Sequence, residues 1–203
     1  MSAQTSYKFG SPIGAAGGLV DLAPYAIDTF LNSENTGVLK FGVGVVKGAT
    51  PGTNVALPSG TSVAADFEGI VVNGRTTEYD VEGNLSIRKG ASVGVMRYGR
   101  IYAKVVHGVS IAVNDPVYLV ISGDNKGLFT NSSSSSIAVA GVFRSAPDSN
   151  DIAQIELFNA PAPAVDNDTV YTLPAATGSV LGGVKVGTGL DVAEDGTISV
   201  HQG

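Results

Sequence analysis

The sequence predicts an all-β protein with an extended N-terminal arm, one short helix and a C-terminal β stalk. Eight strand-length segments are rich in Val and Ile, and clusters of Gly, Pro, Asn and Asp separate them with no helical pattern between. Turn pairs such as Asn73-Gly74 favour antiparallel hairpins. A small antiparallel β-barrel and a jelly-roll-like sandwich both satisfy this pattern. The predicted strands are 38–46, 68–72, 85–88, 93–96, 100–106, 117–121, 137–142 and 152–158.

The N-terminal region contains the predicted arm and the predicted helix. Residues 1–22 are rich in Gly, Ser and Ala without a period, which indicates an extended arm that becomes ordered on a partner. In residues 21–32, Pro24 suits a first helical turn, and Ile27, Phe30 and Leu31 have helical spacing. Two or three turns are too few to be stable alone. Residues 23–160, which include most of this helix, are predicted to form the β body.

The composition changes after residue 160. An Ala/Pro-rich linker is predicted at 161–170, followed by a fibre-like oligomerisation segment at 171–203. Residues 161–203 contain five acidic residues and one basic residue, which is −4 of the formal net charge of −6. Asp195-Gly196 predicts a hairpin over 191–200. Because a two-stranded hairpin is marginal in a monomer, several copies are expected to associate.

Charge and composition exclude several classes of function. Only 15% of the residues are charged, against about 25% in typical globular domains, and 27 of 203 are glycine. The absence of cysteine rules out disulfides, thiolate catalysis and cysteine-ligated metals. The net charge of −6 argues against nucleic acid and membrane surfaces as partners. With no apolar run of about 18 residues and no signal-peptide pattern, we expect an intracellular protein whose surface largely faces other protein.

Motifs for catalysis or metal binding are incomplete. The histidines are His107 and His201, and no Gly-x-Ser-x-Gly element accompanies them, so His107 is interpreted as a strand-end or turn residue. Glu78, Asp80 and Glu82 would share one face of a strand, yet the pattern lacks the glycine loop of a calcium site. We therefore expect no catalytic residues, no cofactor and no metal.

Basic residues alternate with Val, Ile and Tyr between positions 88 and 104. In a strand this spacing places several of them on one face. Such a face favours docking on an acidic protein surface over nucleic acid, because the chain is acidic and has few aromatic residues. The residues concerned are Arg88, Lys89, Arg97, Arg100 and Lys104.

Several sequence blocks across residues 1–160 carry a family resemblance. The most specific is Lys89-Gly-Ala-Ser-Val-Gly-Val-Met-Arg97-Tyr-Gly-Arg-Ile-Tyr-Ala-Lys104. Others are Gly18-Leu-Val-Asp-Leu-Ala-Pro-Tyr25, Phe67-Glu-Gly-Ile-Val-Val-Asn-Gly74 and Asp115-Pro-Val-Tyr-Leu119. Together they resemble the structural cement (capsid decoration) proteins of tailed bacteriophages. The resemblance implies a non-enzymatic virion protein that is made in the host bacterial cytoplasm and bridges major capsid protein subunits on the outer surface of the head.

A second block lies in the C-terminal segment. It reads Tyr171-Thr-Leu-Pro-Ala-Ala-Thr-Gly-Ser-Val-Leu-Gly-Gly-Val-Lys-Val-Gly-Thr-Gly-Leu190 and is similar to a segment of phage head-fibre and tail-fibre proteins. Those fibres are commonly trimeric, so the resemblance implies a trimeric stalk, while a dimer of the cement body stays open. The residues expected to hold the oligomer together are Leu173, Val180, Leu181, Val184, Val186, Leu190 and Ile198.

These observations give one leading hypothesis of function and two alternatives. The leading hypothesis is a capsid decoration protein with a projecting fibre-like tail, whose partners are the major capsid protein and further copies of the chain. One alternative is a trimeric fibre component that binds a host-surface carbohydrate, and the other is a small hydrolase acting through His107. The residues expected to contact the capsid are Tyr7, Leu22, Tyr25, Phe30, Arg97, Arg100 and Lys104.

Overall fold

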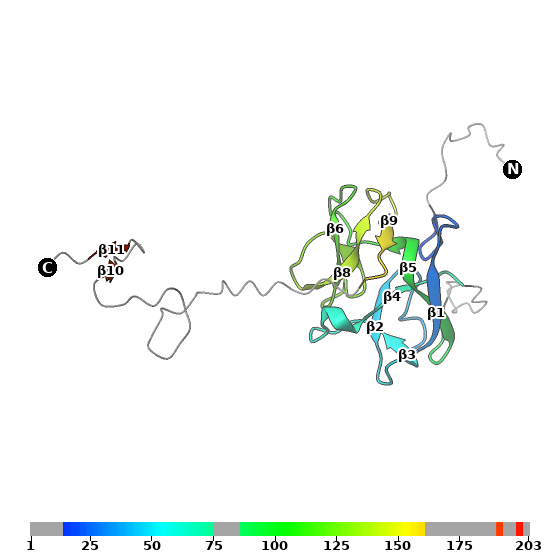
Figure 1. Cartoon of the computed structure of the whole chain (residues 1–203). Helices are drawn as coiled ribbons and strands as arrows, with labels where there is room; N and C mark the ends of the chain where they lie inside the picture. The colour runs from blue at the N-terminus through cyan, green and yellow to red at the C-terminus, as the bar shows by residue number, and fades with distance from the viewer. Residues whose placement is uncertain (1–13, 75–85, 161–189, 193–197, 201–203) are drawn as a thin grey trace, which may run out of the picture. The chain divides into compact units, whose positions relative to one another are not determined.

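The computed structural model describes residues 14–74, 86–160, 190–192 and 198–200. The chain divides into two compact units, Met1–Ala164 and Val165–Gly203. The described part of the first unit is a β body, and that of the second is a single hairpin (Figure 1). The all-β prediction is confirmed.

Five strands of the body close into a barrel. β1 pairs with β3 and β5, β2 pairs with β3 and β4, and β4 pairs with β5, so the ring of hydrogen-bonded neighbours is complete. This closure decides between the two predicted architectures in favour of the barrel. The strands are β1 (Ala26–Asn32), β2 (Gly44–Lys47), β3 (Asn54–Ala56), β4 (Phe67–Val71) and β5 (Ser92–Lys104).

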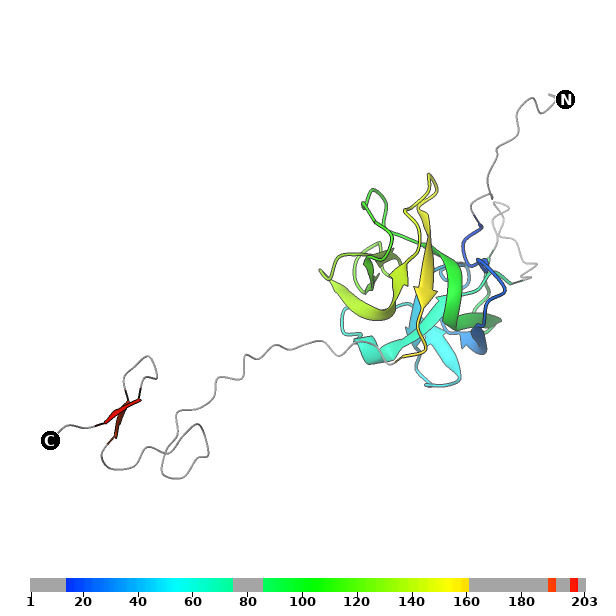
Figure 2. The same ribbon diagram turned by 45° about the horizontal axis from the view of Figure 1, so that its top comes forward.

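The second half of β5 belongs to another sheet. There β5 pairs with β9 (Ile152–Leu157), which pairs with β8 (Ser136–Phe143); beyond them lie β6 (Pro116–Val120) and β7 (Phe129–Thr130). A parallel bridge between Val105 and Phe129 brings β7 back to the end of β5, so this sheet also curls on itself. Figure 2 shows β5 running from the barrel into this second sheet.

Each sheet encloses its own hydrophobic core. The barrel core contains Phe30, Leu39, Val45, Val55 and Val95, all at most 5% exposed. The core of the second sheet has Leu119, Phe129, Phe143, Ile155 and Leu157 at its centre. Outward residues of the barrel, among them Val46, Ile70 and Met96, also pack into this second core, which fixes the two sheets against each other.

The predicted helix at 21–32 is wrong, because residues 26–32 form strand β1. β1 pairs with β5 in a register that runs from Ala26 opposite Tyr98 to Leu31 opposite Ser92. The side chains alternate as in a strand, since Phe30 is 5% exposed and Leu31 is 41% exposed. A helix of two or three turns is marginal, whereas pairing with the long strand β5 gives hydrogen-bond partners to the backbone groups along one edge of β1.

Several predicted strand limits also differ. The segments 93–96 and 100–106 are one strand of 13 residues, and the segment 38–46 is strand only from Gly44. Residues 86–88 are not strand. Short β3 and β7 were not predicted, because two- and three-residue strands carry no period that a sequence pattern reveals.

Part of the predicted arm is docked on the body. The Gly17 amide donates to the Tyr102 carbonyl (2.7 Å), and the Tyr102 amide donates to Gly18 (2.9 Å). Gly17 has φ +79° and lies so close to Asn73 that a Cβ there would be 2.6 Å from the Asn73 nitrogen. Residues 14–20 therefore lie alongside the second half of β5 and are hydrogen-bonded to it. Residues 1–13 lie outside the described part of the chain.

The second unit contains one hairpin among its described residues. β10 (Leu190–Val192) and β11 (Ile198–Val200) are antiparallel, with Leu190 opposite Val200. The pairing predicted around Asp195-Gly196 is confirmed.

Candidate functional site

The first of the predicted capsid-contact arginines is held by carboxylates of its own chain. Arg97 Nη1 lies 3.3 Å from Asp28 Oδ2 on β1, and its Nη2 lies 3.4 Å from Glu68 Oε2 on β4. Glu68 is 7% exposed, and its Oε2 accepts no hydrogen bond within the described residues. The ion pair with Arg97 is therefore what stabilises this buried carboxylate.

The second arginine belongs to a larger network over β5, β8 and β9. Arg100 Nε lies 3.2 Å from Glu156 Oε2 and its Nη1 lies 3.4 Å from Asp21. Arg144 also donates to Glu156, and its second nitrogen donates to Asn114. The hydrogen bond from Arg144, with the positive charge of Arg100, lowers the pKa of Glu156.

These pairs correct the expectation of a basic docking face. The strand spacing does place Arg100 and Lys104 on one side of β5, but β1, β4 and β9 supply carboxylates around the arginines. Three arginines (97, 100 and 144) meet four carboxylates (21, 28, 68 and 156), so the charge of this group is −1. The face is mixed in charge, because neighbouring strands could not be placed from sequence.

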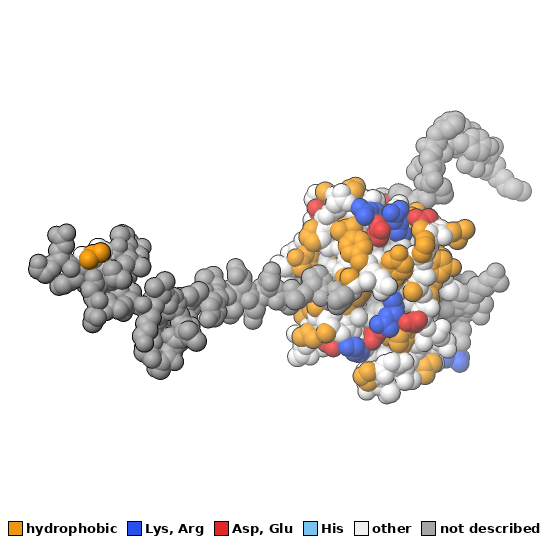
Figure 3. Space-filling model, viewed as in Figure 1, with side chains coloured by type: hydrophobic (Ala, Val, Ile, Leu, Met, Phe, Trp, Pro, Cys, Tyr) orange, Lys and Arg blue, Asp and Glu red, His pale blue; other side chains and the backbone are white. Residues whose placement is uncertain are grey.

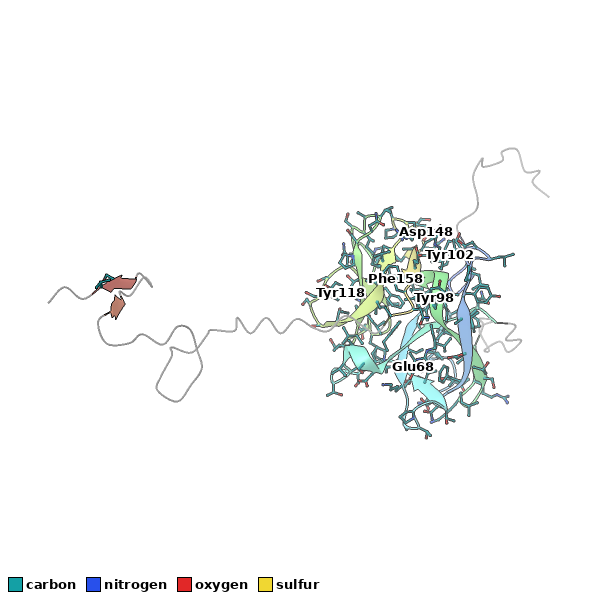
Figure 4. All side chains as sticks on the ribbon, viewed as in Figure 1. Glu68, Tyr98, Tyr102, Tyr118, Asp148 and Phe158 are labelled. Atoms are coloured by element: carbon teal, nitrogen blue, oxygen red, sulfur yellow. The ribbon has the colours of Figure 1, made fainter. Side chains whose placement is uncertain are left out.

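The outward face of the second sheet carries aromatic side chains. Ile101 and Ala103 of β5 are buried, so the alternating Tyr98 and Tyr102 point outward. Gly99 pairs with Leu157, which sets Tyr98 opposite Phe158 one step farther on. Figure 4 shows Tyr118, Phe158 and Tyr98 following one another from β6 to β5. We call these three residues the aromatic row.

Small apolar residues complete this face between the rings. The Phe158 amide donates to the Ala140 carbonyl (2.8 Å), and Tyr118 pairs with Ala138, so two alanines of β8 lie between Phe158 and Tyr118. Phe158 is 40% exposed. Figure 3 shows hydrophobic side chains across the middle of this face, with charged groups above and below. Sequence reasoning missed the row because its members come from three separate strands.

The remaining predicted contact residues separate into exposed and buried ones. Leu22 is 89% exposed and Tyr25 is 46% exposed, in the segment that leads into β1. Phe30 is a correction: it lies in the barrel core, since β1 is a strand whose Phe30 side points inward. Tyr7 lies outside the described residues.

The predicted oligomerisation residues are placed only in part. Leu190 and Ile198 lie on the two strands of the C-terminal hairpin, where Val192 is the register partner of Ile198. The others lie outside the described part of the chain: Leu173, Val180, Leu181, Val184 and Val186.

The histidine and the carboxylates that the sequence offered for catalysis or metal binding are His107, Glu78, Asp80 and Glu82. His107 Nδ1 lies 2.9 Å from Asp151 Oδ2, and the histidine side chain is 91% exposed, as expected for a residue just after a strand. Glu78, Asp80 and Glu82 lie outside the described residues. Among the residues that the structure describes, no three His, Cys, Asp or Glu side chains form a group suited to a metal ion. No helix in the same residues has the length and apolar character to cross a membrane.

Comparisons with known proteins agree with this architecture. The family model for structural cement proteins (E217 gp24/Pam3 gp6) matches residues 3–158, which is 156 of 203 residues. A chain in the solved capsid of Myoviridae phage XM1 has the same fold, with a TM-score of 0.58 and 18% identity. The match covers 78% of this chain and 99% of that chain. No curated protein matches the sequence. The family match spans nearly the whole β body, so the chain belongs to the phage structural cement proteins.

Proposed function

We propose that this protein binds the outer surface of a phage head and stabilises it by bridging neighbouring major capsid protein subunits. The observation that carries the proposal is the cement-family match over residues 3–158. A protein that binds only the assembled shell stabilises it by its binding free energy. No chemical step is required, so the role is structural rather than enzymatic.

The N-terminal region supports a bridging role. Residues 14–20 are fixed along β5, and the next residues expose Leu22 and Tyr25. The 13 residues before Gly14 reach up to about 45 Å if extended, at roughly 3.3–3.6 Å per residue. A segment of that reach contacts a neighbouring subunit while the body stays on another.

The C-terminal segment is proposed to project from the head as a homotrimeric fibre-like stalk, with a dimer as the alternative. A two-stranded hairpin such as β10–β11 has too little buried surface to be stable alone. Association of several copies supplies that surface. It also joins several bodies, so that weak contacts with the shell combine into tight attachment.

The test uses purified heads that lack this protein. Adding the full chain should saturate the heads in a sedimentation assay and raise the temperature at which they break open. Deletion of residues 1–13 should weaken head binding at least about tenfold, with no change in the melting temperature of the free protein. Deletion of 1–22 is a poorer test, because it also removes the segment paired with β5. Full-length protein that fails to bind heads, or leaves their stability unchanged, would contradict the proposal.

The stalk is tested separately in the free protein. A chain ending at residue 163 should have the mass of a monomer by light scattering, whereas the full chain should have three times that mass. An equal subunit number for both chains would show that the tail does not hold the oligomer together.

A further inference from the structure

Part of the outward face of the second sheet is apolar, although Arg100, Lys104 and Glu156 lie on the same face. In an antiparallel sheet with one face on the core, the other face is ordinarily polar. Here the outward positions include Tyr118 on β6, Ala138 and Ala140 on β8, and Tyr98 on β5. Phe158, directly after β9, adds a ring that is 40% exposed.

The arginines on and beside this face are paired with carboxylates of the same chain. Arg97 is paired with Asp28 and Glu68 on one side, and Arg100 and Arg144 with Glu156 on the other. A partner that offered charges would have to compete with these internal pairs. The face is therefore complementary to an uncharged surface.

The width of the row suits a protein partner. Tyr118, Phe158 and Tyr98 span β6, β8, β9 and β5, which at about 4.8 Å between strands is roughly 14 Å. Ala26 pairs with Tyr98, so the exposed segment with Leu22 and Tyr25 borders the row on its β1 side. Buried aromatic residues surrounded by paired charges are typical of the centre of a protein interface.

We propose that the aromatic row is the surface that seats on the major capsid protein, and that it binds an apolar, uncharged patch of that protein. This inference rests on the proposed function and specifies its contact. The arginines of β5 are then held by carboxylates of their own chain at the border of this contact.

The first test is the salt dependence of binding by the full chain. Contacts between charges weaken as salt screens them, whereas apolar contacts do not. Between about 50 and about 500 mM NaCl, the Kd for protein-free heads should change less than about threefold. A Kd that rises tenfold or more would overturn the proposal, because it would show that ion pairs make the contact.

The second test is substitution in the row. Phe158→Ser should weaken head binding at least about tenfold, and Phe158→Leu should retain most of it. The matched control is Val38→Ser, because Val38 is 44% exposed and lies in the β1–β2 loop, next to Gly37, whose amide donates to the Ile87 carbonyl. Unchanged melting temperatures establish that the variants are folded.

The outcomes separate this inference from the proposed function. If the full chain does not bind heads, the proposed function fails. If it binds and Phe158→Ser binds equally well, only the aromatic row is excluded as the contact. If Phe158→Ser instead reduces the mass of the free protein and leaves head binding intact, a second copy covers the row and the inference is wrong.

Discussion

The barrel and the second sheet share strand β5 but differ in how they close and in what they show on the outside. Hydrogen-bonded pairing between all five strands closes the barrel, whereas the second sheet returns to β5 through the Val105–Phe129 bridge. The barrel strands β1 and β4 carry Asp28 and Glu68, paired with Arg97. The second sheet presents the aromatic row.

The two halves of strand β5 therefore have different roles. Residues 92–98 of β5 complete a closed ring whose edges are covered, which is the arrangement that best resists edge-to-edge association. Residues 99–104 lie in the second sheet, whose outward face combines the Arg100–Glu156 ion pair with the aromatic row. The closed barrel thus carries the second sheet, and the second sheet carries the aromatic row.

The largest expected effect comes from removing the core of either sheet. Phe30→Ala and Phe129→Ala should each destabilise the protein by about 3–5 kcal/mol, since both rings are buried. Hydrogen exchange should then distinguish them. Phe129→Ala should speed exchange in β6 and β8 while β3, whose Val55 lies in the barrel core, stays protected, because the second sheet closes through Phe129. Equal exchange throughout the body would show that the two sheets unfold as one unit.

A smaller effect is expected from glycine in the barrel wall. Gly69 has φ +146°, and a Cβ there would overlap the Met96 carbonyl oxygen on β5. Gly69→Ala should cost roughly 2–3 kcal/mol in a denaturant titration. Gly52→Ala is the control, because Gly52 also has positive φ (+78°) but no atom within 4 Å of the added Cβ. Similar losses for the two variants would attribute the effect to backbone conformation alone.

Next comes the pH dependence of the charged network on the second sheet. Because Arg144 and Arg100 lower the pKa of Glu156, its ionised form favours the folded state. That stabilisation is present above the usual value of 4.5 and is lost as pH falls through the lowered pKa. Glu156→Gln should therefore reduce stability near pH 7 by about 1 kcal/mol or less, and should differ little from wild type near pH 2. An equal difference at both values would contradict the assignment.

The smallest effect is expected at His107. Its pair with Asp151 is solvent-exposed, so His107→Ala should shift the melting temperature by about 2 °C or less and leave head binding unchanged. Loss of head binding in this variant would place the contact at the loops beside the β8–β9 turn and away from the aromatic row.

The sequence predicted the strands that carry a clear period and missed the contacts made between distant segments. β6, β8 and β9 were located to within a residue or two, because each is a run of Val and Ile bounded by turn residues. The segment of β1 has helical spacing at Ile27, Phe30 and Leu31, and only its pairing with β5 makes it a strand. The local pattern of apolar residues could not show the pairing of β1 with β5.

The candidate site shows the same limit. Strand spacing places Arg100 and Lys104 on one face of β5, but it does not show the carboxylates that β1, β4 and β9 bring to Arg97 and Arg100. Phe30 was expected to contact the capsid as part of the predicted helix, but in strand β1 its side chain lies in the barrel core. The aromatic row joins residues 98, 118 and 158, and only the strand order brings them together.

The most direct test of the central claim is cryo-electron microscopy of heads decorated with the full chain. We expect β bodies at regular sites on the outer surface, each touching two neighbouring capsid subunits, with Tyr118, Phe158 and Tyr98 turned toward the shell. Density for this protein only at the tail of the phage, or a β body that touches a single capsid subunit, would contradict the claim that this protein cements the capsid.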